Sequence, residues 1–396
     1  MKLIFISSIT PDKESYWNGA FTRSGNNVVT GIVDGIPSNI EMELWSCQPI
    51  PSFPEGKLWI GRHREELSNG RVIQFLPILN IKFIKNYFWG FCCFLKTILW
   101  RIGHIKEECV MLTYNNDTPP IEFLYWGCRL SGIKLYAILY DLGEPPQSFN
   151  IGRLTRFAYS YTNWWAKRII KRLDGRIVIN ELIVRDYAPG KDYLLIDGGI
   201  NQDVIRHLFP LKPSKNDELV FVLAGMLWEQ NGTRLVLQML NEHPDLNVKV
   251  VFAGKGIDVP LIQEQASFDP RIEYAGMLNM DELFKLYERA DVLLNIRIED
   301  TVDYHFPSKL LEYMSTGKYV ISTPVAHAGR DYNEFLSILE SVTPEELYNK
   351  IFKVISCGKE YLYEKGKKTR QFILENRNWN VQTARILDYL NIKSNK

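Results

Sequence analysis

Short apolar runs alternate with amphipathic segments through most of the chain. In the second half, runs rich in valine, leucine and isoleucine occur at residues 219–225, 248–253, 272–274, 292–295 and 319–323. Between them, apolar residues recur every three or four positions, which predicts helices at 233–241, 281–289 and 308–315. Strand, glycine turn and helix units that repeat about every 25 to 30 residues are typical of an open parallel α/β sheet.

The first half follows the same order. We predict strands at residues 3–7, 110–113, 134–139 and 176–179, and helices from about residue 24, at 121–131 and from residue 180. The sequence from Asp197 to Asn201 then breaks the pattern, and Pro210 and Pro213 follow in a polar segment that suits a hinge. Since 396 residues exceed one ordinary core, we expect two domains, at 1–200 and 214–375.

The composition is that of a globular protein with balanced charges. Hydrophobic residues make up 46% of the chain and charged residues 23%, and the formal net charge is +1. Nucleic-acid binding needs a clustered excess of positive charge, so we expect no nucleic-acid partner. The six cysteines show neither metal-ligand spacing nor a disulfide framework, which favours a reducing cytoplasm. The N-terminal apolar run predicts a buried strand rather than a signal peptide, and no run has the length of a membrane-spanning helix.

Residues 304–323 carry the strongest chemical signal. They predict a loop, a helix with Ser308 as its N-cap, and a buried strand. A helix N-terminus attracts anions through unpaired N–H groups and its dipole, and Lys309 adds a full positive charge there. Glu312 lies one turn further along the same face, where its carboxylate can accept bonds from two hydroxyls. A binding site for a phosphate beside an acceptor for two neighbouring hydroxyls suits a nucleotide. The alternative is that Lys309 and Glu312 form a solvated pair on a helix surface.

This stretch resembles the donor-binding segment of GT-B glycosyltransferases, especially the retaining enzymes of family 4. In that family a Glu-x7-Glu pair spans the loop and helix, and the second glutamate holds the donor ribose. The second position matches Glu312, and the first falls on Tyr304. The resemblance also places Pro307 and Ser308 at the donor. It implies two Rossmann-like, doubly wound parallel-sheet domains that face a cleft, with the N-terminal domain on the acceptor side.

The turn that begins at Gly225 resembles the glycine loop of the same family. An arginine and a lysine of that loop usually clamp the diphosphate, but here these positions are Met226 and Asn231. Two phosphates must still be neutralised if the nucleotide is to leave. We therefore expect Lys309 and Arg297 to replace the two missing cations.

Three further segments extend the resemblance over nearly the whole chain. The short strand near residue 274 looks like the segment whose backbone meets the donor base, which implies Met277 and Leu278. The loop after the first strand would face the donor phosphates and the acceptor, which implies Asn18 and Gly19, although an ordinary turn explains this loop equally well. A tryptophan-bearing C-terminal segment implies a helix at 379–396 that packs back on the first domain.

The turn after the strand at 134–139 offers the candidate catalytic carboxylates. Enzymes of family 4 often carry a histidine here, whereas this chain has only Asp141 and Glu144 as ionisable groups. Either could assist deprotonation of the acceptor or stabilise positive charge that develops on the sugar. The alternative for Asp141 is a local cap ahead of Pro145.

Residues 82–102 predict an amphipathic helix. One arc of the helix is polar and the opposite arc is apolar. The polar arc holds Lys82, Lys85, Asn86, Lys96 and Thr97, and the apolar arc holds Ile84, Tyr87, Phe88, Phe91, Leu95, Ile98 and Ile102. Such a helix can lie in the interface of an anionic membrane, or it can cover the sheet of its own domain. A second basic cluster, which follows Trp164 and Trp165, favours the membrane.

The sequence as a whole predicts a glycosyltransferase that moves a hexose from a nucleoside diphosphate sugar to a hydroxyl of a glycan or lipid-linked glycan. We expect retention of configuration, no metal or other cofactor, UDP or GDP as the nucleotide, and a role in bacterial surface polysaccharide assembly at the cytoplasmic membrane. The alternatives are a non-catalytic partner subunit and an inverting enzyme with Asp141 or Glu144 as base. The expected catalytic residues are Asp141, Glu144 and Lys309. The expected donor-binding residues are Asn18, Gly19, Gly225, Met277, Leu278, Arg297, Tyr304, Pro307, Ser308, Lys309 and Glu312.

Overall fold

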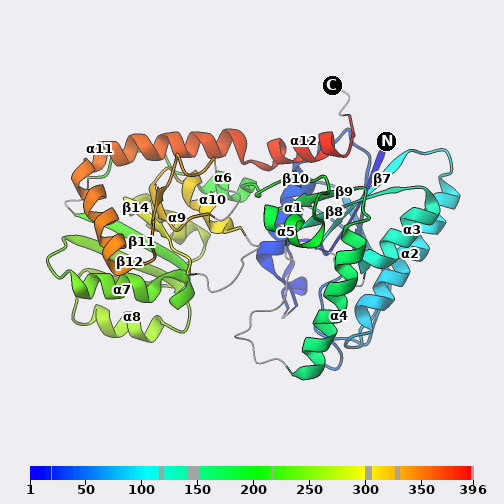
Figure 1. The fold of residues 1–396 in the computed structure, drawn as a ribbon, viewed down its shortest axis with the longest axis horizontal. Coiled ribbons are helices and arrows are strands. Elements are labelled where there is room, and N and C mark those ends of the chain that lie inside the picture. The colour runs from blue at the N-terminus through cyan, green and yellow to red at the C-terminus, as the bar shows by residue number, and fades with distance from the viewer. Residues whose placement is uncertain are drawn as a thin grey trace. The chain divides into compact units, whose positions relative to one another are not determined.

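The computed structural model describes residues 1–18, 20–115, 120–140, 152–215, 218–298, 306–325 and 331–393. The chain forms two compact units (Figure 1). Unit 1 consists of residues 1–198 together with 379–396, and unit 2 consists of residues 199–378. The segment that the sequence predicts as a linker belongs to unit 2 and contains a short helix, α6 (Gln202–His207).

Unit 1 is built on an eight-stranded sheet with the order β10-β9-β8-β7-β1-β2-β5-β4. All its strand pairs are parallel except β4 with β5. The strands are β1 (Lys2–Ser7), β2 (Met42–Ser46), β4 (His63–Glu66), β5 (Val72–Phe75), β7 (Cys109–Tyr114), β8 (Lys134–Leu139), β9 (Gly175–Val178) and β10 (Leu194–Leu195). The apolar residues of β1 are fully buried, as expected for a central parallel strand covered on both faces. A separate antiparallel pair joins β3 (Trp59–Ile60) and β6 (Ile78–Leu79).

The helices of unit 1 fall close to the predicted ranges where a prediction was made. They are α1 (Arg23–Gly35), α2 (Lys85–Gly103), α3 (Pro120–Ser131), α4 (Arg153–Ile170), α5 (Glu181–Tyr187) and α12 (Trp379–Tyr389), with a 3₁₀ turn η1 (Glu14–Tyr16). Asn180 caps α5, because its side chain accepts a bond from the Leu182 N–H. Helices α2 and α3 pack against each other, and Gly90 lets them approach closely, since a Cβ there would lie 2.7 Å from the Phe123 ring.

The C-terminal helix α12 packs on α1 through two glycines one turn apart. A Cβ on Gly31 would lie 2.0 Å from the indole nitrogen of Trp379, and a Cβ on Gly35 would lie 2.5 Å from the Trp379 carbonyl oxygen. The hydroxyl of Thr383 donates to the Gly35 carbonyl oxygen at 2.6 Å. Because Gly31 and Gly35 have no side chains, α12 can pack closely against α1.

Gly31→Ala should destabilise unit 1 by about 1 to 3 kcal/mol, because the added methyl group overpacks against a buried indole. Helix propensity alone would favour alanine in α1 by about 1 kcal/mol, so the contact with Trp379 reverses the sign. Hydrogen exchange of the α12 amides measures the effect. Gly103→Ala is the matched control, since nothing lies within 4 Å of a Cβ at that helical glycine. Equal protection in the two variants would show that α12 does not depend on this contact.

Unit 2 contains a six-stranded, fully parallel sheet with the order β13-β12-β11-β14-β15-β16. The strands are β11 (Leu219–Met226), β12 (Val248–Lys255), β13 (Ile272–Gly276), β14 (Val292–Asn295), β15 (Tyr319–Ser322) and β16 (Ser337–Ile338). The chain builds outward from β11 in one direction and then returns to add β14 on its other side. This reversal makes the gap between β11 and β14 a topological switch point, where ligands of open α/β sheets bind beyond the carboxyl ends of the strands.

The helices of unit 2 connect these strands. They are α6, η2 (Glu229–Asn231), α7 (Thr233–Glu242), α8 (Val259–Ala266), α9 (Met280–Arg289), α10 (Ser308–Ser315) and α11 (Pro344–Asn376). A capping box starts α9, in which Asn279 and Glu282 each accept from the other's backbone N–H. Gly358 has φ +76° and interrupts α11 with a kink. The two parallel sheets with their connecting helices confirm the predicted α/β class.

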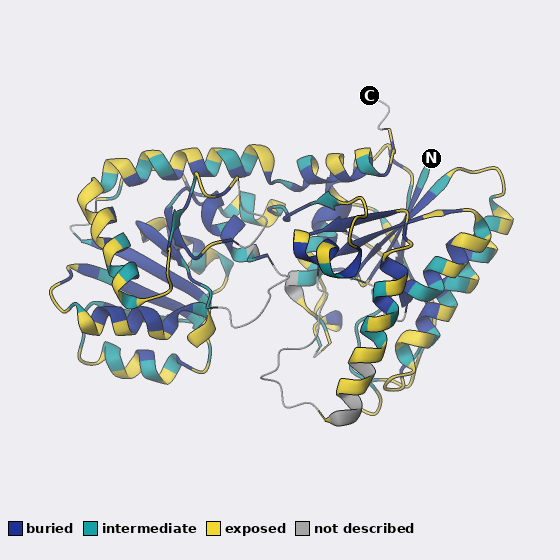
Figure 2. Ribbon diagram, in the orientation of Figure 1, coloured by how far each residue is buried: buried dark blue, intermediate teal, exposed yellow. Residues whose placement is uncertain are grey.

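Helix α2 turns Lys85, Lys96 and Thr97 of its predicted polar arc inward, whereas Lys82 and Asn86 are exposed. Thr97 is fully buried and donates to the Cys93 carbonyl oxygen, and Lys96 donates to Gln74 at 2.6 Å with its ammonium 4.3 Å from the Trp45 ring. Lys85 donates to the Ile50 carbonyl oxygen. Figure 2 shows the exposed residues of α2 in yellow, and the large apolar ones among them are Tyr87, Phe91, Leu95, Leu99 and Ile102. The helix does cover its own sheet, but through the face that the sequence predicts as solvated, because lysine stems and threonine can bury when their polar ends find partners.

Candidate functional site

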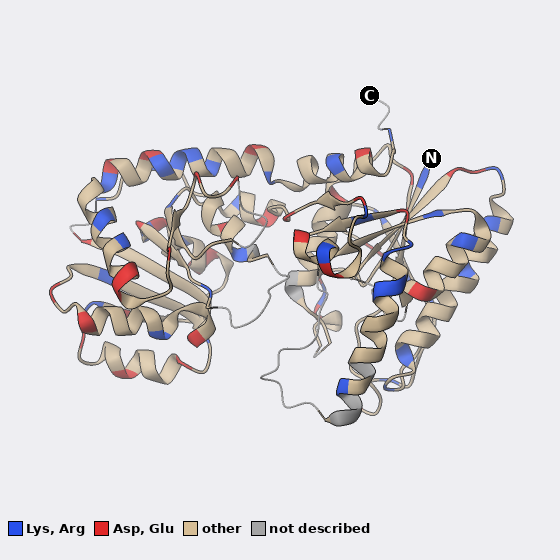
Figure 3. Ribbon diagram, viewed as in Figure 1, with Lys and Arg blue, Asp and Glu red and all other residues tan. Residues whose placement is uncertain are grey.

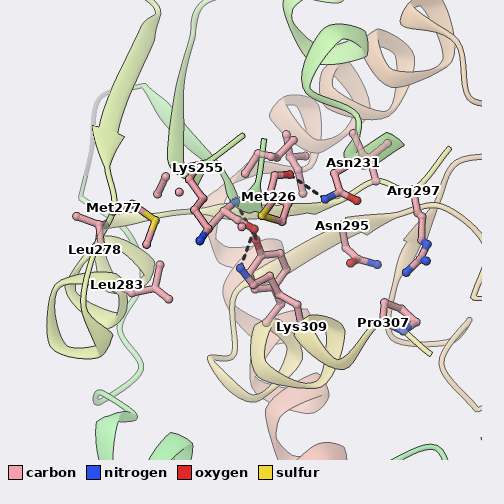
Figure 4. A pocket seen from close by; sticks show the side chains of 18 of the residues that line it. Met226, Asn231, Lys255, Met277, Leu278, Leu283, Asn295, Arg297, Pro307 and Lys309 are labelled. Atoms are coloured by element: carbon pink, nitrogen blue, oxygen red, sulfur yellow. Dashed lines mark hydrogen bonds between the residues drawn. The ribbon is translucent and has the colours of Figure 1, made fainter. Parts of the chain in front are cut away.

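A cavity of about 650 Å³ lies in unit 2 at the topological switch point (Figure 4). Its wall is formed by the carboxyl ends of β11, β12 and β14, by the turn after β13 and by the first turns of α10. Figure 4 shows Met277, Leu278 and Leu283 at one end of the cavity and Arg297 at the other, with Lys255 and Lys309 between them. The size suits a ligand larger than a single sugar.

Two glycines let the cavity reach down to the backbone of the sheet. Gly225 and Gly254 are paired across β11 and β12, with φ of +131° and +134°. A Cβ on Gly254 would lie 1.9 Å from the Gly225 carbonyl oxygen, and a Cβ on Gly225 would lie 2.9 Å from the Lys309 ammonium. The positive φ disfavours an L-amino acid at both positions, and at Gly254 a side chain would also clash with the backbone of Gly225.

Lys309 extends from the second position of α10 into the cavity wall. Its ammonium donates to the Ala224 carbonyl oxygen at 2.8 Å. The buried hydroxyl of Tyr313 accepts from the Ala224 N–H at 3.0 Å and donates to the same carbonyl at 3.1 Å. Burial lowers the pKa of Lys309, and the neighbouring Glu312 carboxylate opposes that shift. The ammonium is thus held by a neutral carbonyl, in a place where an anionic ligand would compensate its desolvation.

Glu312 follows one turn later on α10 and accepts a bond from the Tyr287 hydroxyl at 2.8 Å. Tyr287 is fully buried, and burial together with the charge of Glu312 raises its pKa well above the usual value. Its ring stands nearly perpendicular to that of Tyr313 at a centroid distance of 5.5 Å. Glu312 is half-buried beside the cavity and is not one of the described residues that form its wall. A carboxylate has lone pairs for several donors, so this bond leaves acceptor capacity for a ligand.

Three cations line the described wall of the cavity, namely Lys255, Arg297 and Lys309. Met226 and Asn231 also line it, but they bring no charge, and the Asn231 amide donates to the Met226 carbonyl oxygen at 2.8 Å. Sequence analysis missed Lys255 as a site residue. The available signal was its place directly after Gly254 at the end of a predicted strand, which is where polar side chains of parallel sheets usually serve function.

The N-terminus of α10 opens at the same wall. The structure corrects the predicted cap, because Pro307 is the N-cap residue and Ser308 is the first helical residue. Pro307 has no side-chain hydrogen bond to the helix and lines the cavity. The first-turn N–H groups of this eight-residue helix therefore add a positive dipole end beside the Lys309 ammonium.

The remaining predicted residues fall into two groups. Asn18 lies in unit 1, where its side chain bonds the Pro49 carbonyl oxygen and the Ala20 N–H and so stabilises a local turn. Gly19, Asp141, Glu144 and Tyr304 lie outside the described residues, as does the side chain of Ser308. The cavity thus brings together Gly225, Met277, Leu278, Arg297, Pro307 and Lys309. Within the described part of the chain, no cluster of three or more histidine, cysteine, aspartate or glutamate side chains suits a metal ion.

Comparison with known proteins identifies the domain that carries this cavity. Residues 218–356 match the family model described as glycosyl transferases group 1. No curated protein matches the chain. The matched range covers the strands, the glycine turns and helix α10 that form the cavity wall.

Solved structures resemble the chain over its whole length. Sucrose-phosphate synthase from Thermosynechococcus elongatus is 14% identical with a TM-score of 0.62, over 99% of this chain and 98% of that one. Anabaena HepE in complex with UDP is 12% identical with a TM-score of 0.63, over 99% and 100%. A glycosyltransferase from Rickettsia africae is 14% identical with a TM-score of 0.67, over 100% of both chains. These likenesses show the predicted GT-B fold, and the family match makes the part of the chain that holds the cavity similar to the glycosyl transferases of group 1.

Proposed function

We propose that this GT-B glycosyltransferase transfers a sugar from a nucleoside diphosphate sugar, with UDP or GDP as the nucleotide, to a hydroxyl of a glycan or lipid-linked glycan. The observation that carries the proposal is the cavity at the switch point of unit 2, whose wall combines three cations with a helix N-terminus. The similar structure of HepE contains UDP, which supports a nucleotide as the ligand.

The two ends of the cavity suit the two ends of such a donor. Met277, Leu278 and Leu283 give one end an apolar surface for a flat base. Lys255 and Lys309 lie where the diphosphate would follow, and Arg297 lies further along. Glu312, beside the wall, would accept bonds from the ribose hydroxyls.

The chemistry requires the nucleoside diphosphate to leave with its negative charge. Hydrogen-bond donors and positive charges that are held in place before the reaction stabilise such negative charge, because they need little reorganisation. Lys309, the α10 N-terminus, Arg297 and Lys255 supply fixed positive charge around the cavity, and this supports metal-independent transfer. Retention of configuration rests on the resemblance to family 4, and Asp141 and Glu144 stay candidates for proton transfer at the acceptor.

The biological setting that we propose is the assembly of a bacterial surface polysaccharide on the inner face of the cytoplasmic membrane. No described helix has the length and apolar character needed to cross a bilayer. The apolar outer side of α2 supports a peripheral position, where the protein would meet a lipid-linked acceptor at the membrane surface.

A screen of UDP-, GDP-, dTDP- and ADP-sugars tests the proposed donor. Calorimetry with each nucleotide should find one that binds clearly more tightly than the others, and the corresponding sugar donor should be hydrolysed slowly when no acceptor is present. Failure of every nucleotide to bind would overturn the assignment of the cavity as a donor site.

Glu312→Ala is expected to weaken binding of the preferred nucleotide about tenfold to a hundredfold, or roughly 1.5 to 3 kcal/mol, because a charged acceptor for the ribose hydroxyls is lost. Calorimetry measures the change. Tyr287→Phe is the matched control, since it removes the hydroxyl that bonds Glu312 but leaves the carboxylate in place. Unchanged affinity of Glu312→Ala would remove this residue from the site.

A further inference from the structure

Helix α2 exposes an apolar stripe that unit 1 does not use for its own core. The stripe follows helical spacing through Ile84, Tyr87, Phe91, Leu95 and Ile102, all of which are exposed. The opposite side of the helix holds the buried residues, including Trp89, Cys93 and Trp100. Soluble helices normally turn polar residues outward, whereas α2 is largely apolar on both its buried and its exposed side.

Helix α4 carries a second exposed stripe of the same kind. Phe157 is 69% exposed, Tyr161 47% and Trp164 51%, again at spacings of three and four residues. Exposed aromatic side chains in series on a helix are unusual on a free protein surface. The Arg168 guanidinium lies 4.5 Å from the Trp164 ring and ends the stripe with a positive charge.

The two stripes belong to one face of unit 1. Helix α3 packs against both α2 and α4 and exposes Trp126 and Leu130. Burial raises the pKa of Tyr87 on α2, and the nearby Tyr161 of α4 and Glu122 of α3 raise it further. Trp59 extends the face beyond α2, where its ring meets Phe88 edge to face at 5.8 Å. We call this exposed surface of α2, α3 and α4 the aromatic face.

Helices α2 and α4 carry charges of one sign, whereas α3 between them carries Glu122 and Arg129. Residues 82–106 contain Lys82, Lys85, Lys96, Arg101 and Lys106 and no acidic residue. Residues 152–173 contain Arg153, Arg156, Lys167, Arg168, Lys171 and Arg172, again with no acidic residue. Figure 3 shows α2 and α4 with basic residues only. Lys85 and Lys96 bond inside unit 1, so the basic residues that α2, α4 and the adjoining segments expose include Lys82, Arg156, Arg168, Lys171 and Arg172.

We propose that the aromatic face binds the surface of an anionic lipid bilayer, with its rings at the depth of the headgroups and its basic residues on the lipid phosphates. Aromatic side chains beside lysine and arginine are the combination that membrane interfaces favour. A second copy of the chain suits the face less well, because a symmetric dimer would bring the same basic residues together. The inference deepens the proposed membrane location but depends only on unit 1, not on the donor site.

Vesicle flotation tests the proposal with the full-length protein. Binding to vesicles that contain phosphatidylglycerol should exceed binding to pure phosphatidylcholine by at least about tenfold, and salt should weaken it. Phe91→Ser with Leu95→Ser on α2, or Phe157→Ser with Trp164→Ser on α4, should each reduce binding about tenfold or more. These residues are exposed, so the substitutions should leave the fold intact.

The control replaces two exposed phenyl groups of unit 2, as Phe268→Ser with Phe352→Ser, and should bind vesicles like the wild type. Every variant should still bind the nucleotide, because the aromatic face lies in unit 1 and the cavity in unit 2. This measurement separates the membrane test from the test of the donor site. Equal binding of the α2 and α4 variants and the wild type, or no binding of the wild type to anionic vesicles, would overturn the proposal. The proposal would also be overturned if the wild type sediments as a dimer and these variants sediment as monomers. That result would assign the aromatic face to contact with a second copy of the chain.

Discussion

Lys309→Ala should lower kcat about a hundredfold, with a smaller rise in KM. The reason is that the leaving nucleoside diphosphate gains charge in the transition state, and an ammonium beside it then interacts more strongly than in the ground state. The substitution should not unfold unit 2, because the Tyr313 hydroxyl still donates to the Ala224 carbonyl oxygen that Lys309 leaves. Steady-state kinetics with the preferred nucleotide sugar measure both constants.

The pH profile of kcat/KM supplies a second readout for the same group. Burial lowers the pKa of Lys309, so the ammonium of the free enzyme loses its proton at a lower pH than an ordinary lysine. Activity should therefore fall as the pH rises through this lowered pKa, and Lys309→Arg should move the fall to higher pH. Arg297→Ala should lower kcat in the same direction but by less, since Arg297 lies further along the cavity from the base-binding end than Lys309. Near-normal turnover of Lys309→Ala would mean that the phosphates bind elsewhere.

The fold could be predicted from the sequence because local and global signals agree. The strands of a parallel sheet are buried on both faces, so they read as unbroken apolar runs, and the glycine turns that end them are just as visible. The predicted strand at 134–139 coincides with β8, and the predicted helix at 308–315 with α10. The long helix α11 lies in a stretch of the sequence for which no element was predicted, and its kink at Gly358 divides the apolar repeat.

The candidate site was harder to predict, because it depends on which strand ends meet. The family pattern drew attention to Met226 and Asn231, where two cations are missing from the glycine loop. The sheet order places β12 beside β11, and this brings Lys255 to the same cavity from a different turn. The place of Lys255 after a predicted strand could have marked it as a candidate, but only the topology shows that it lies at the same cavity as Lys309 and Arg297.

The orientation of α2 shows a different limit of sequence reasoning. Its hydrophobic pattern gave the right helix and the right two arcs, but the usual rule that the apolar arc faces the core is wrong here. Lys96 and Thr97 find partners inside unit 1, whereas Phe91 and Leu95 are exposed. Periodicity divides a helix into faces, and only packing decides which face is inside.

The largest effect on stability is expected from Gly254→Ala. Its φ of +134° is unfavourable for any L-amino acid, and the new Cβ would lie 1.9 Å from the Gly225 carbonyl oxygen, a backbone atom that cannot move without breaking the pairing of β11 with β12. We expect a loss of about 3 kcal/mol or more in the unfolding free energy of unit 2. Hydrogen exchange of the β11 and β12 amides should then accelerate roughly a hundredfold.

Gly276→Ala separates the steric part of this effect from the conformational part. Gly276 also has a positive φ, of +76°, but nothing lies within 4 Å of a Cβ built there. This control should cost only about 1 to 2 kcal/mol, the price of the left-handed conformation alone. If both variants lose the same amount, the close approach of the two turns contributes nothing to stability. If Gly254→Ala alone is severely destabilised and also loses nucleotide binding, the donor cavity depends on the close approach of the paired glycines.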